Sequence, residues 1–184
     1  DEIEHPAVRE ALKMLGMTEG VELHHDGDLP ARSGMGSSSS FAVGLLHALY
    51  AMKGKSRGVG ELATEATFLE QEVLKEHVGC QDQFAAAVGG FNHILFSRGG
   101  NVGIHPVRIG RNRLEALQDH LMLAWTGVAR YSSEVTAGYI GDLNGSCAPR
   151  LKALAKLVDD GMTLLEGSRP IEDFGALLNW GWAI

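Results

Sequence analysis

The sequence predicts an α+β fold divided between two domains. Two observations carry this prediction. Apolar residues recur at helical spacing in segments separated by glycines and polar breaks, and two short apolar runs flank Arg98-Gly-Gly-Asn101, a turn typical of a β-hairpin. The pattern becomes almost entirely helical toward the C-terminus, and the change near residue 115 predicts domains of 1–114 and 115–184.

The N-terminal half is predicted to alternate helices with loops. Residues 6–15 are expected to form a helix because Pro6 suits a helix start and apolar residues follow at helical spacing. Residues 21–25 alternate weakly and are predicted to form a strand. A glycine- and serine-rich loop then leads into an apolar helix over 38–52, and an amphipathic helix follows over 60–76.

The later elements follow from turn and breaker residues. Asp82 and the pair Gly89-Gly90 bound a short helix, and strands over 91–97 and 102–109 flank the hairpin turn. The other expected elements are a helix over 112–119, a strand over 120–125 and helices over 132–142, 149–167 and 170–183.

Composition and charge narrow the function classes. The 184 residues are 45% hydrophobic, and the net charge of −7 argues against nucleic acid or an anionic membrane as a partner. The two cysteines have no metal-binding or disulfide spacing, and no apolar run is long enough to span a membrane, so a cytoplasmic protein is expected. Because the chain opens and closes within predicted helices, we expect a fragment that associates through apolar surface, for example as a homodimer.

The stretch from Asp28 to Ser40 places a glycine turn, Gly34-Met-Gly36, and four serines directly before the apolar helix. Glycines let backbone N–H groups approach a ligand, a helix N-terminus has unpaired N–H groups and a positive partial charge, and serines add hydroxyl groups. The loop is therefore a candidate phosphate site. The simpler interpretation is that Ser37 or Ser38 only caps the helix. Walker, dinucleotide-binding and nucleophile-elbow patterns do not occur in this stretch.

One glutamate of the helix over 60–76 departs from its pattern. Glu70 has mainly apolar helical neighbours, whereas the other glutamates lie on the solvent-facing side. These others are Glu61, Glu65, Glu72 and Glu76. A carboxylate directed at a core needs a partner. The partner is either Lys75 or Arg57 in an ion pair, or a Mg²⁺ ion held beside phosphates.

Asp82 lies in the turn Gly79-Cys-Gln-Asp-Gln83, where the next helix begins. Taken alone, an aspartate at this place is a helix N-cap. Beside a phosphate site, it can instead accept a proton from a substrate hydroxyl. The residues by themselves leave both interpretations open.

Together these residues resemble the GHMP kinases, the family of galactokinase, homoserine kinase, mevalonate kinase and phosphomevalonate kinase. The phosphate loop of that family, P-x-x-x-G-L-G-S-S-A, corresponds to Pro30-Ala-Arg-Ser-Gly-Met-Gly-Ser-Ser-Ser39. In its sugar-kinase branch a metal-binding Glu lies twelve positions before a catalytic Asp in a G-x-x-D-Q segment, as Glu70 lies before Asp82 here. The chain is most similar to the D-glycero-D-manno-heptose 7-phosphate kinase branch, in ARSGMGSSSSF, QDQ and GGFNHI.

The resemblance implies a fold of two domains. The N-terminal domain of the family binds ATP and has a fold similar to that of domain 2 of ribosomal protein S5, and its C-terminal domain is ferredoxin-like. This chain would hold part of each, in 1–114 and 115–184. Two family segments have no counterpart in the sequence, namely an N-terminal strand-rich segment and a C-terminal glycine-rich motif.

The resemblance also implies roles for individual residues. Ser38 and Glu70 would hold Mg²⁺, and Asp82 would orient or deprotonate a sugar hydroxyl, the anomeric one of a heptose 7-phosphate, which attacks the γ-phosphate of ATP. Arg130 and Ser132 would contact the phosphate of the sugar, although an exposed arginine at a helix start needs no such role. The residues expected at the ATP phosphates are Arg32, Ser33, Gly34, Met35, Gly36, Ser37, Ser38 and Ser39.

Two other functions compete with a sugar kinase. The first is a kinase-like protein that binds nucleotide without turnover, or an inactive kinase fragment. The second is a structural α/β domain with a capped helix, which leaves the position of Glu70 unexplained.

Overall fold

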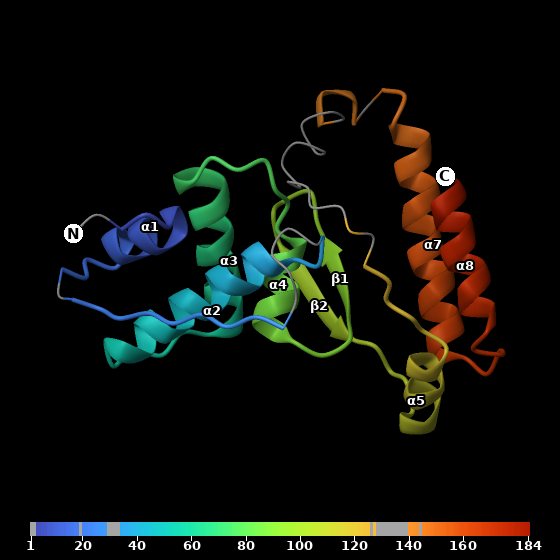
Figure 1. Ribbon diagram of the computed structural model, residues 1–184. Coiled ribbons are helices and arrows are strands. Elements are labelled where there is room, and N and C mark those ends of the chain that lie inside the picture. Colours follow the sequence, from blue (N-terminus) through green and yellow to red (C-terminus); the bar gives the residue numbers. More distant parts are fainter. Residues whose placement is uncertain (1–2, 19, 29–33, 126, 128–139, 144) are drawn as a thin grey trace. The chain divides into compact units, whose positions relative to one another are not determined.

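The computed structural model describes residues 3–18, 20–28, 34–125, 127, 140–143 and 145–184 (Figure 1). The described residues form several helices and a two-stranded sheet, so the α+β class is confirmed. The chain divides into two compact units. One contains Asp1–Gly89 and Trp125–Gly138, and the other contains Gly90–Ala124 and Tyr139–Ile184.

The first unit is a group of packed helices. They are α1 (Pro6–Met14), α2 (Ser37–Met52), α3 (Val59–Phe68), a π-helical turn η1 (Leu69–Val73) and α4 (Gln81–Val88). Helices α2, α3 and α4 contact one another, and α1 contacts α2 and η1. The core is built largely from the inner face of α2, where Leu46 and Leu49 are fully buried. Burying one leucine side chain stabilises a fold by about 1.5–3 kcal/mol. Because α2 supplies several of the buried apolar side chains, it contributes much of the stability of this unit.

The helix predicted over 60–76 is two elements in the structure. Helix α3 ends at Phe68 and continues as the π turn η1, and the chain then turns at Lys75, which has a left-handed φ of 58°. The N–H of Glu76 donates to the carbonyl of Glu70 at 2.9 Å and closes this end. The wider π turn directs two consecutive residues, Leu69 and Glu70, into the interior, where both are buried.

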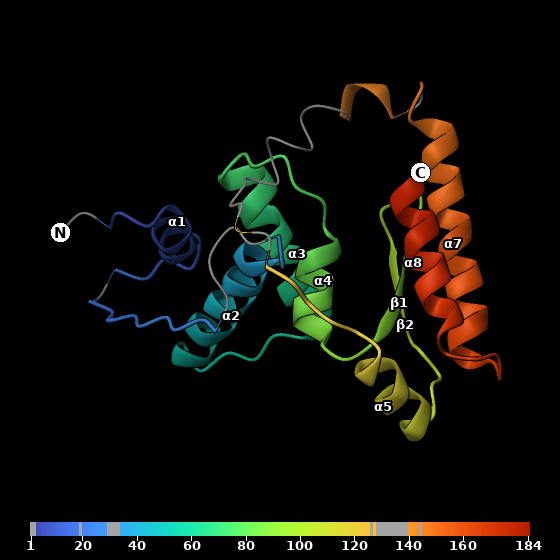
Figure 2. The same cartoon turned by 45° about the vertical axis from the view of Figure 1, so that its right-hand side comes forward.

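In the described part of the second unit, a hairpin is combined with three α-helices. Strands β1 (Asn92–Phe96) and β2 (Val102–Pro106) pair antiparallel and form the hairpin that the turn residues predicted. In this pairing His93 lies opposite His105. Helix α5 (Arg111–Asp119) follows, then a 3₁₀ turn η2 (Ile140–Asp142), α7 (Ala148–Glu166) and α8 (Asp173–Ala183). Helices α7 and α8 lie side by side (Figure 2).

A small core holds the helices of the second unit together. Leu117 of α5 packs with Leu164 and Leu165 at the end of α7 and with Ile171 before α8. Partly buried residues surround these four, namely Val107, Ile109, Ala116, Phe174 and Leu177. The outer faces of α7 and α8 expose large apolar side chains, among them Trp180 and Trp182.

Two predicted strands are wrong. Residues 21–25 and 120–125 belong to no strand, as far as the described part of these segments shows. An extended segment becomes a strand only when its N–H and C=O groups pair with a neighbour, and the described residues supply none to either segment. The helix predicted over 132–142 lies largely outside the described residues. No helix among the described residues is long and apolar enough to cross a membrane.

Candidate functional site

The site begins at the glycine turn before α2. Gly34 and Gly36 have φ values of 79° and 68°, a left-handed conformation that favours glycine. Gly36 is the N-cap residue, and the first helical hydrogen bond runs from the N–H of Ser40 to its carbonyl at 3.0 Å. The interpretation of Ser37 or Ser38 as the helix cap is therefore wrong. The backbone N–H groups of the first turn have no acceptor within the helix and are available to an anion.

Two serines of this first turn bind the same carboxylate. The Ser38 hydroxyl donates to Glu70 Oε1 at 2.7 Å, and the Ser39 hydroxyl donates to Glu70 Oε2 at 2.9 Å. Ser38 is exposed at the helix start, whereas Ser39 is only 5% exposed. The Ser39 hydroxyl is thus engaged inside the protein, and its backbone N–H, in the first turn of α2, has no acceptor within the helix.

Glu70 is 1% exposed and has three neutral donors. The third is the side-chain amide of Gln83, whose Nε2 donates to Oε2. The alternative of an ion pair with Lys75 or Arg57 is wrong: Lys75 pairs with Glu72, and Arg57 lies near Glu61 and Glu65. Among the described residues Glu70 has no cationic partner, and a buried carboxyl group of this kind depends on its hydrogen bonds for solvation.

Asp82 lies in the first turn of α4, directly before Gln83. The N-cap of α4 is Cys80, so the interpretation of Asp82 as a cap is wrong. Its Oδ2 lies 3.2 Å from the position that a Cβ on Gly36 would occupy. The Asp82 carboxylate therefore lies against the glycine turn, although the two residues are far apart in the sequence.

The predicted site residues fall into two groups. The structure brings together Gly36, Ser38, Ser39, Glu70 and Asp82. Gly34, Met35 and Ser37 belong to the same turn and helix start. Arg32, Ser33, Arg130 and Ser132 lie outside the described residues, so their roles stay predictions.

Gln83 is the residue that sequence reasoning missed. It is 1% exposed, and its Oε1 is buried without a partner among the described residues. The signal lay in helical spacing: Ala86 and Ala87, three and four positions later, pack on the core, so Gln83 shares their inner face. An unpaired buried acceptor costs about 1–3 kcal/mol, which marks this glutamine as an unusual core residue.

A second acidic group, Glu76, feels the charge of Glu70. Burial, and then the charge of Glu70, raises the pKa of the Glu76 carboxyl above its ordinary value. A raised pKa in the folded state means that the contribution of Glu76 to stability is fully present below its unfolded pKa of about 4.3 and is lost as the pH rises through the folded value.

Replacing Glu76 by glutamine is therefore expected to stabilise the protein at neutral pH. The gain should shrink toward zero near about pH 4, where the wild-type side chain is already protonated. Urea unfolding of both proteins at the two pH values measures the difference. An equal gain at both values, or a loss at neutral pH, contradicts this assignment.

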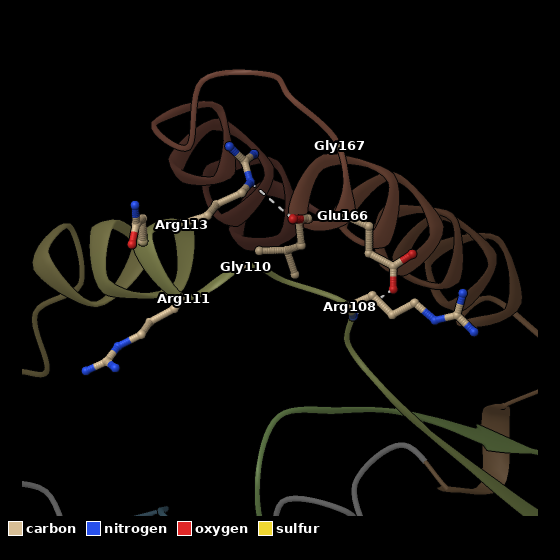
Figure 3. A pocket seen from close by; sticks show the side chains of 8 residues that line it. Arg108, Gly110, Arg111, Arg113, Glu166 and Gly167 are labelled. Carbon is tan, nitrogen blue, oxygen red and sulfur yellow. Dashed lines mark hydrogen bonds between the residues drawn. The ribbon is translucent and has the colours of Figure 1, made fainter.

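The second unit contains an open hollow of about 470 Å³ between the start of α5 and the end of α7 (Figure 3). The Arg113 side chain and the Arg108 backbone are engaged in the fold. Arg113 donates to two carbonyl groups of α7, at 2.7 and 3.1 Å, and Glu166 accepts the backbone N–H of Arg108 at 2.9 Å. Arg111 pairs with Glu115 at 2.9 Å. The Arg113 contacts satisfy carbonyl groups at the end of α7 and join α5 to it, so we assign them a structural role.

The glycine turn, the buried Glu70 and Asp82 all lie in a part of the chain that matches a known protein family. Residues 4–90 match the family model described as the GHMP kinases N terminal domain. This part of the chain belongs to the GHMP kinase family, as its motifs predicted.

Two known proteins are similar over most or all of the chain. The chain is 31% identical over 155 residues to the D-glycero-alpha-D-manno-heptose 7-phosphate kinase of Campylobacter jejuni subsp. jejuni serotype O:2, in an alignment that covers 84% of this chain and 45% of that protein. The structure matches the crystal structure of a D-glycero-D-manno-heptose 1-phosphate kinase from Bacteriodes thetaiotaomicron with a TM-score of 0.71 and 25% identity. That match covers 100% of this chain and 56% of the other. The chain therefore spans about half the length of these relatives.

Proposed function

We propose that this protein is an ATP-dependent sugar kinase and that this chain carries its phosphate loop, its Mg²⁺ ligands and its general base. The observation that carries the proposal is the convergence on one helix start. The Glu70 carboxylate and the Ser38 hydroxyl lie 2.7 Å apart at the N-terminus of α2, and the Asp82 carboxylate lies against Gly36 at the same turn.

The oxygen atoms at this place fit Mg²⁺. The ion is usually held by one or two carboxylates together with substrate phosphates, and it needs no cage of protein ligands. Among the described residues, no three His, Cys, Asp or Glu side chains gather as a metal site. Ser38 and Glu70 would hold the ion. When bound, Mg²⁺ neutralises charge on the transferring phosphoryl group.

The residues of the chain would act by positioning. The first N–H groups of α2 and the turn at Gly34 and Gly36 would bind the ATP phosphates. Asp82 would accept a hydrogen bond from the sugar hydroxyl and take its proton as the hydroxyl attacks. Phosphoryl transfer requires little more of the protein than alignment and charge stabilisation.

The names of the two relatives suggest a heptose phosphate as the acceptor. We propose the anomeric hydroxyl of a heptose 7-phosphate, with Arg130 and Ser132 at the phosphate of the sugar. The division into an ATP-binding domain, 1–114, and a second domain, 115–184, and the cytoplasmic location belong to the same proposal.

The test is ADP release by the protein with Mg²⁺-ATP and a panel of acceptors. The panel contains heptose 7-phosphate, heptose 1-phosphate, galactose, fucose and mevalonate, with the Asp82→Asn variant as control. ADP release with one heptose phosphate, lost in the variant, supports the proposal. If the protein binds ATP but releases no ADP with any acceptor of the panel, the result favours a protein that binds nucleotide without turnover.

Replacing Gly36 by alanine is expected to lower kcat/KM by roughly 10- to 100-fold. The added Cβ would lie 3.2 Å from Asp82 Oδ2 and displace the carboxylate, and small displacements at a reacting centre cost up to about 100-fold. Gly34→Ala is the matched control, because Gly34 has a similar φ, and no atom of the described residues lies within 4 Å of its added Cβ. Steady-state kinetics of both variants measures the contrast, and equal losses would show that backbone strain alone is responsible.

A further inference from the structure

We infer that Gln83 and Ser39 are positioning residues that hold the Glu70 carboxylate with its Oε1 oxygen toward the cation. The inference rests on the proposed function, and it goes further by naming the oxygen that binds the metal and the two side chains that select it. Neither side chain would touch the cation or the sugar.

The hydrogen bonds on the two carboxylate oxygens are unequal. Among the described residues, Oε2 accepts from the Gln83 amide and from the Ser39 hydroxyl, whereas Oε1 accepts from the Ser38 hydroxyl alone. A carboxylate oxygen has two lone-pair sites. Both sites of Oε2 are therefore used inside the protein, and one site of Oε1 remains. That site is next to the Ser38 hydroxyl, the other oxygen proposed for the metal.

The burial of the two donors makes this orientation rigid. Gln83 is 1% exposed and Ser39 is 5% exposed, so neither can rotate into water without breaking the packing around it. The π turn η1 directs Glu70 into the interior, and α4 brings Gln83 to meet it. Because Asp82 precedes Gln83 on α4, one helical turn carries both the proposed base and the proposed support of the metal ligand.

The neutrality of the donors matters as much as their geometry. A lysine or arginine in place of Gln83 would compensate the negative charge of Glu70 and compete with a cation. An amide and a hydroxyl group donate hydrogen bonds to the carboxylate and add no positive charge beside it. Ser39 occupies the position at which the general family pattern has alanine, a residue that has no hydroxyl group to donate.

The test compares Gln83→Met with the wild type. Methionine keeps most of the side-chain volume and removes the donor, and Glu70 retains the two serine hydroxyls, so the variant is expected to fold. Outer-shell partners of metal ligands typically contribute 10- to 100-fold to metal affinity. We expect the dissociation constant of Mn²⁺ in the presence of ADP, measured by electron paramagnetic resonance of free Mn²⁺, to rise by roughly that factor. The Mg²⁺ concentration for half-maximal ADP release should rise in parallel, while the KM for the sugar phosphate stays unchanged.

Two further variants make the result specific. Gln118→Met makes the same chemical change at an exposed position of α5 in the second unit and should leave Mn²⁺ affinity unchanged. Ser39→Ala removes the other donor to Oε2 and installs the residue of the family pattern, so it should fold and weaken Mn²⁺ binding in the same direction. It tests the inference even if Gln83→Met fails to fold.

The outcomes separate the inference from the proposed function. A wild-type protein that binds no Mn²⁺ with ADP overturns both. A wild-type protein that binds Mn²⁺, with equal affinity in folded Gln83→Met and in Ser39→Ala, overturns the positioning role and leaves the kinase proposal standing. If the KM for the sugar phosphate rises in these variants as much as the Mn²⁺ dissociation constant does, the positioning role is also overturned, because equal losses indicate a distorted fold.

Discussion

Replacing Asp82 by asparagine is expected to lower kcat by a factor of 10² to 10⁴, the range that general bases contribute. Asparagine keeps the size of the side chain against Gly36 but cannot take a proton from the sugar hydroxyl. The loss should appear in kcat, because the variant retains the glycine turn, the start of α2 and the Glu70 cluster. Measurements of ADP release and of nucleotide affinity on the same samples separate the two effects.

Asp119→Asn is the matched control for this change. Asp119 is exposed at the end of α5, so the same substitution there should leave kcat unchanged. If Asp82→Asn retains a kcat near the wild-type value, Asp82 is not the base, and its place beside Gly36 has another purpose. If nucleotide affinity falls as far as kcat does, Asp82 acts in binding.

Replacing Glu70 by alanine is expected to remove Mg²⁺-nucleotide binding and to lower the free energy of unfolding by about 2–4 kcal/mol. The carboxylate is the acceptor for two buried donors, the Gln83 amide and the Ser39 hydroxyl, and each donor left without a partner costs about 1–3 kcal/mol. Loss of the desolvation penalty of the buried charge offsets part of this cost. Urea unfolding and Mn²⁺ titration measure the two effects.

Glu72→Ala and Glu70→Gln are the informative comparisons. Glu72 is the exposed neighbour that pairs with Lys75, and surface pairs of this kind contribute about 0–1 kcal/mol, so its loss should change little. Glu70→Gln keeps the volume and part of the hydrogen bonding, and should lose metal binding with a smaller loss of stability. Unchanged Mn²⁺ affinity in Glu70→Ala would return Glu70 to a structural role, since its burial would then serve the fold alone.

Much of the local structure could be predicted because it depends on nearby residues. Pro6 at a helix start, the apolar stripe of α2 and the turn between β1 and β2 each act within a few positions, and all three are in the structure. The strand over 21–25 failed because a strand requires a partner that no local pattern reveals. The π turn after Phe68 could not be predicted for a related reason. Whether a helix widens at one place depends on the tertiary contacts of the residues there, which no local pattern reveals.

The sequence by itself determined the family that residues 4–90 match and the side chains from which the candidate site is built. The glycine turn before a serine-rich helix start, and the spacing of Glu70 and Asp82, predicted the GHMP kinase family, which residues 4–90 match. The tertiary structure alone decided how these residues meet. It directed Glu70 inward through the π turn, supplied Gln83 and Ser39 as its donors, and placed Asp82 against Gly36. The contact between Gly36 and Asp82 joins residues 46 positions apart in the sequence. Such residues meet only when the helices pack, because burial of the apolar face of α2, and not local helix propensity, brings them together.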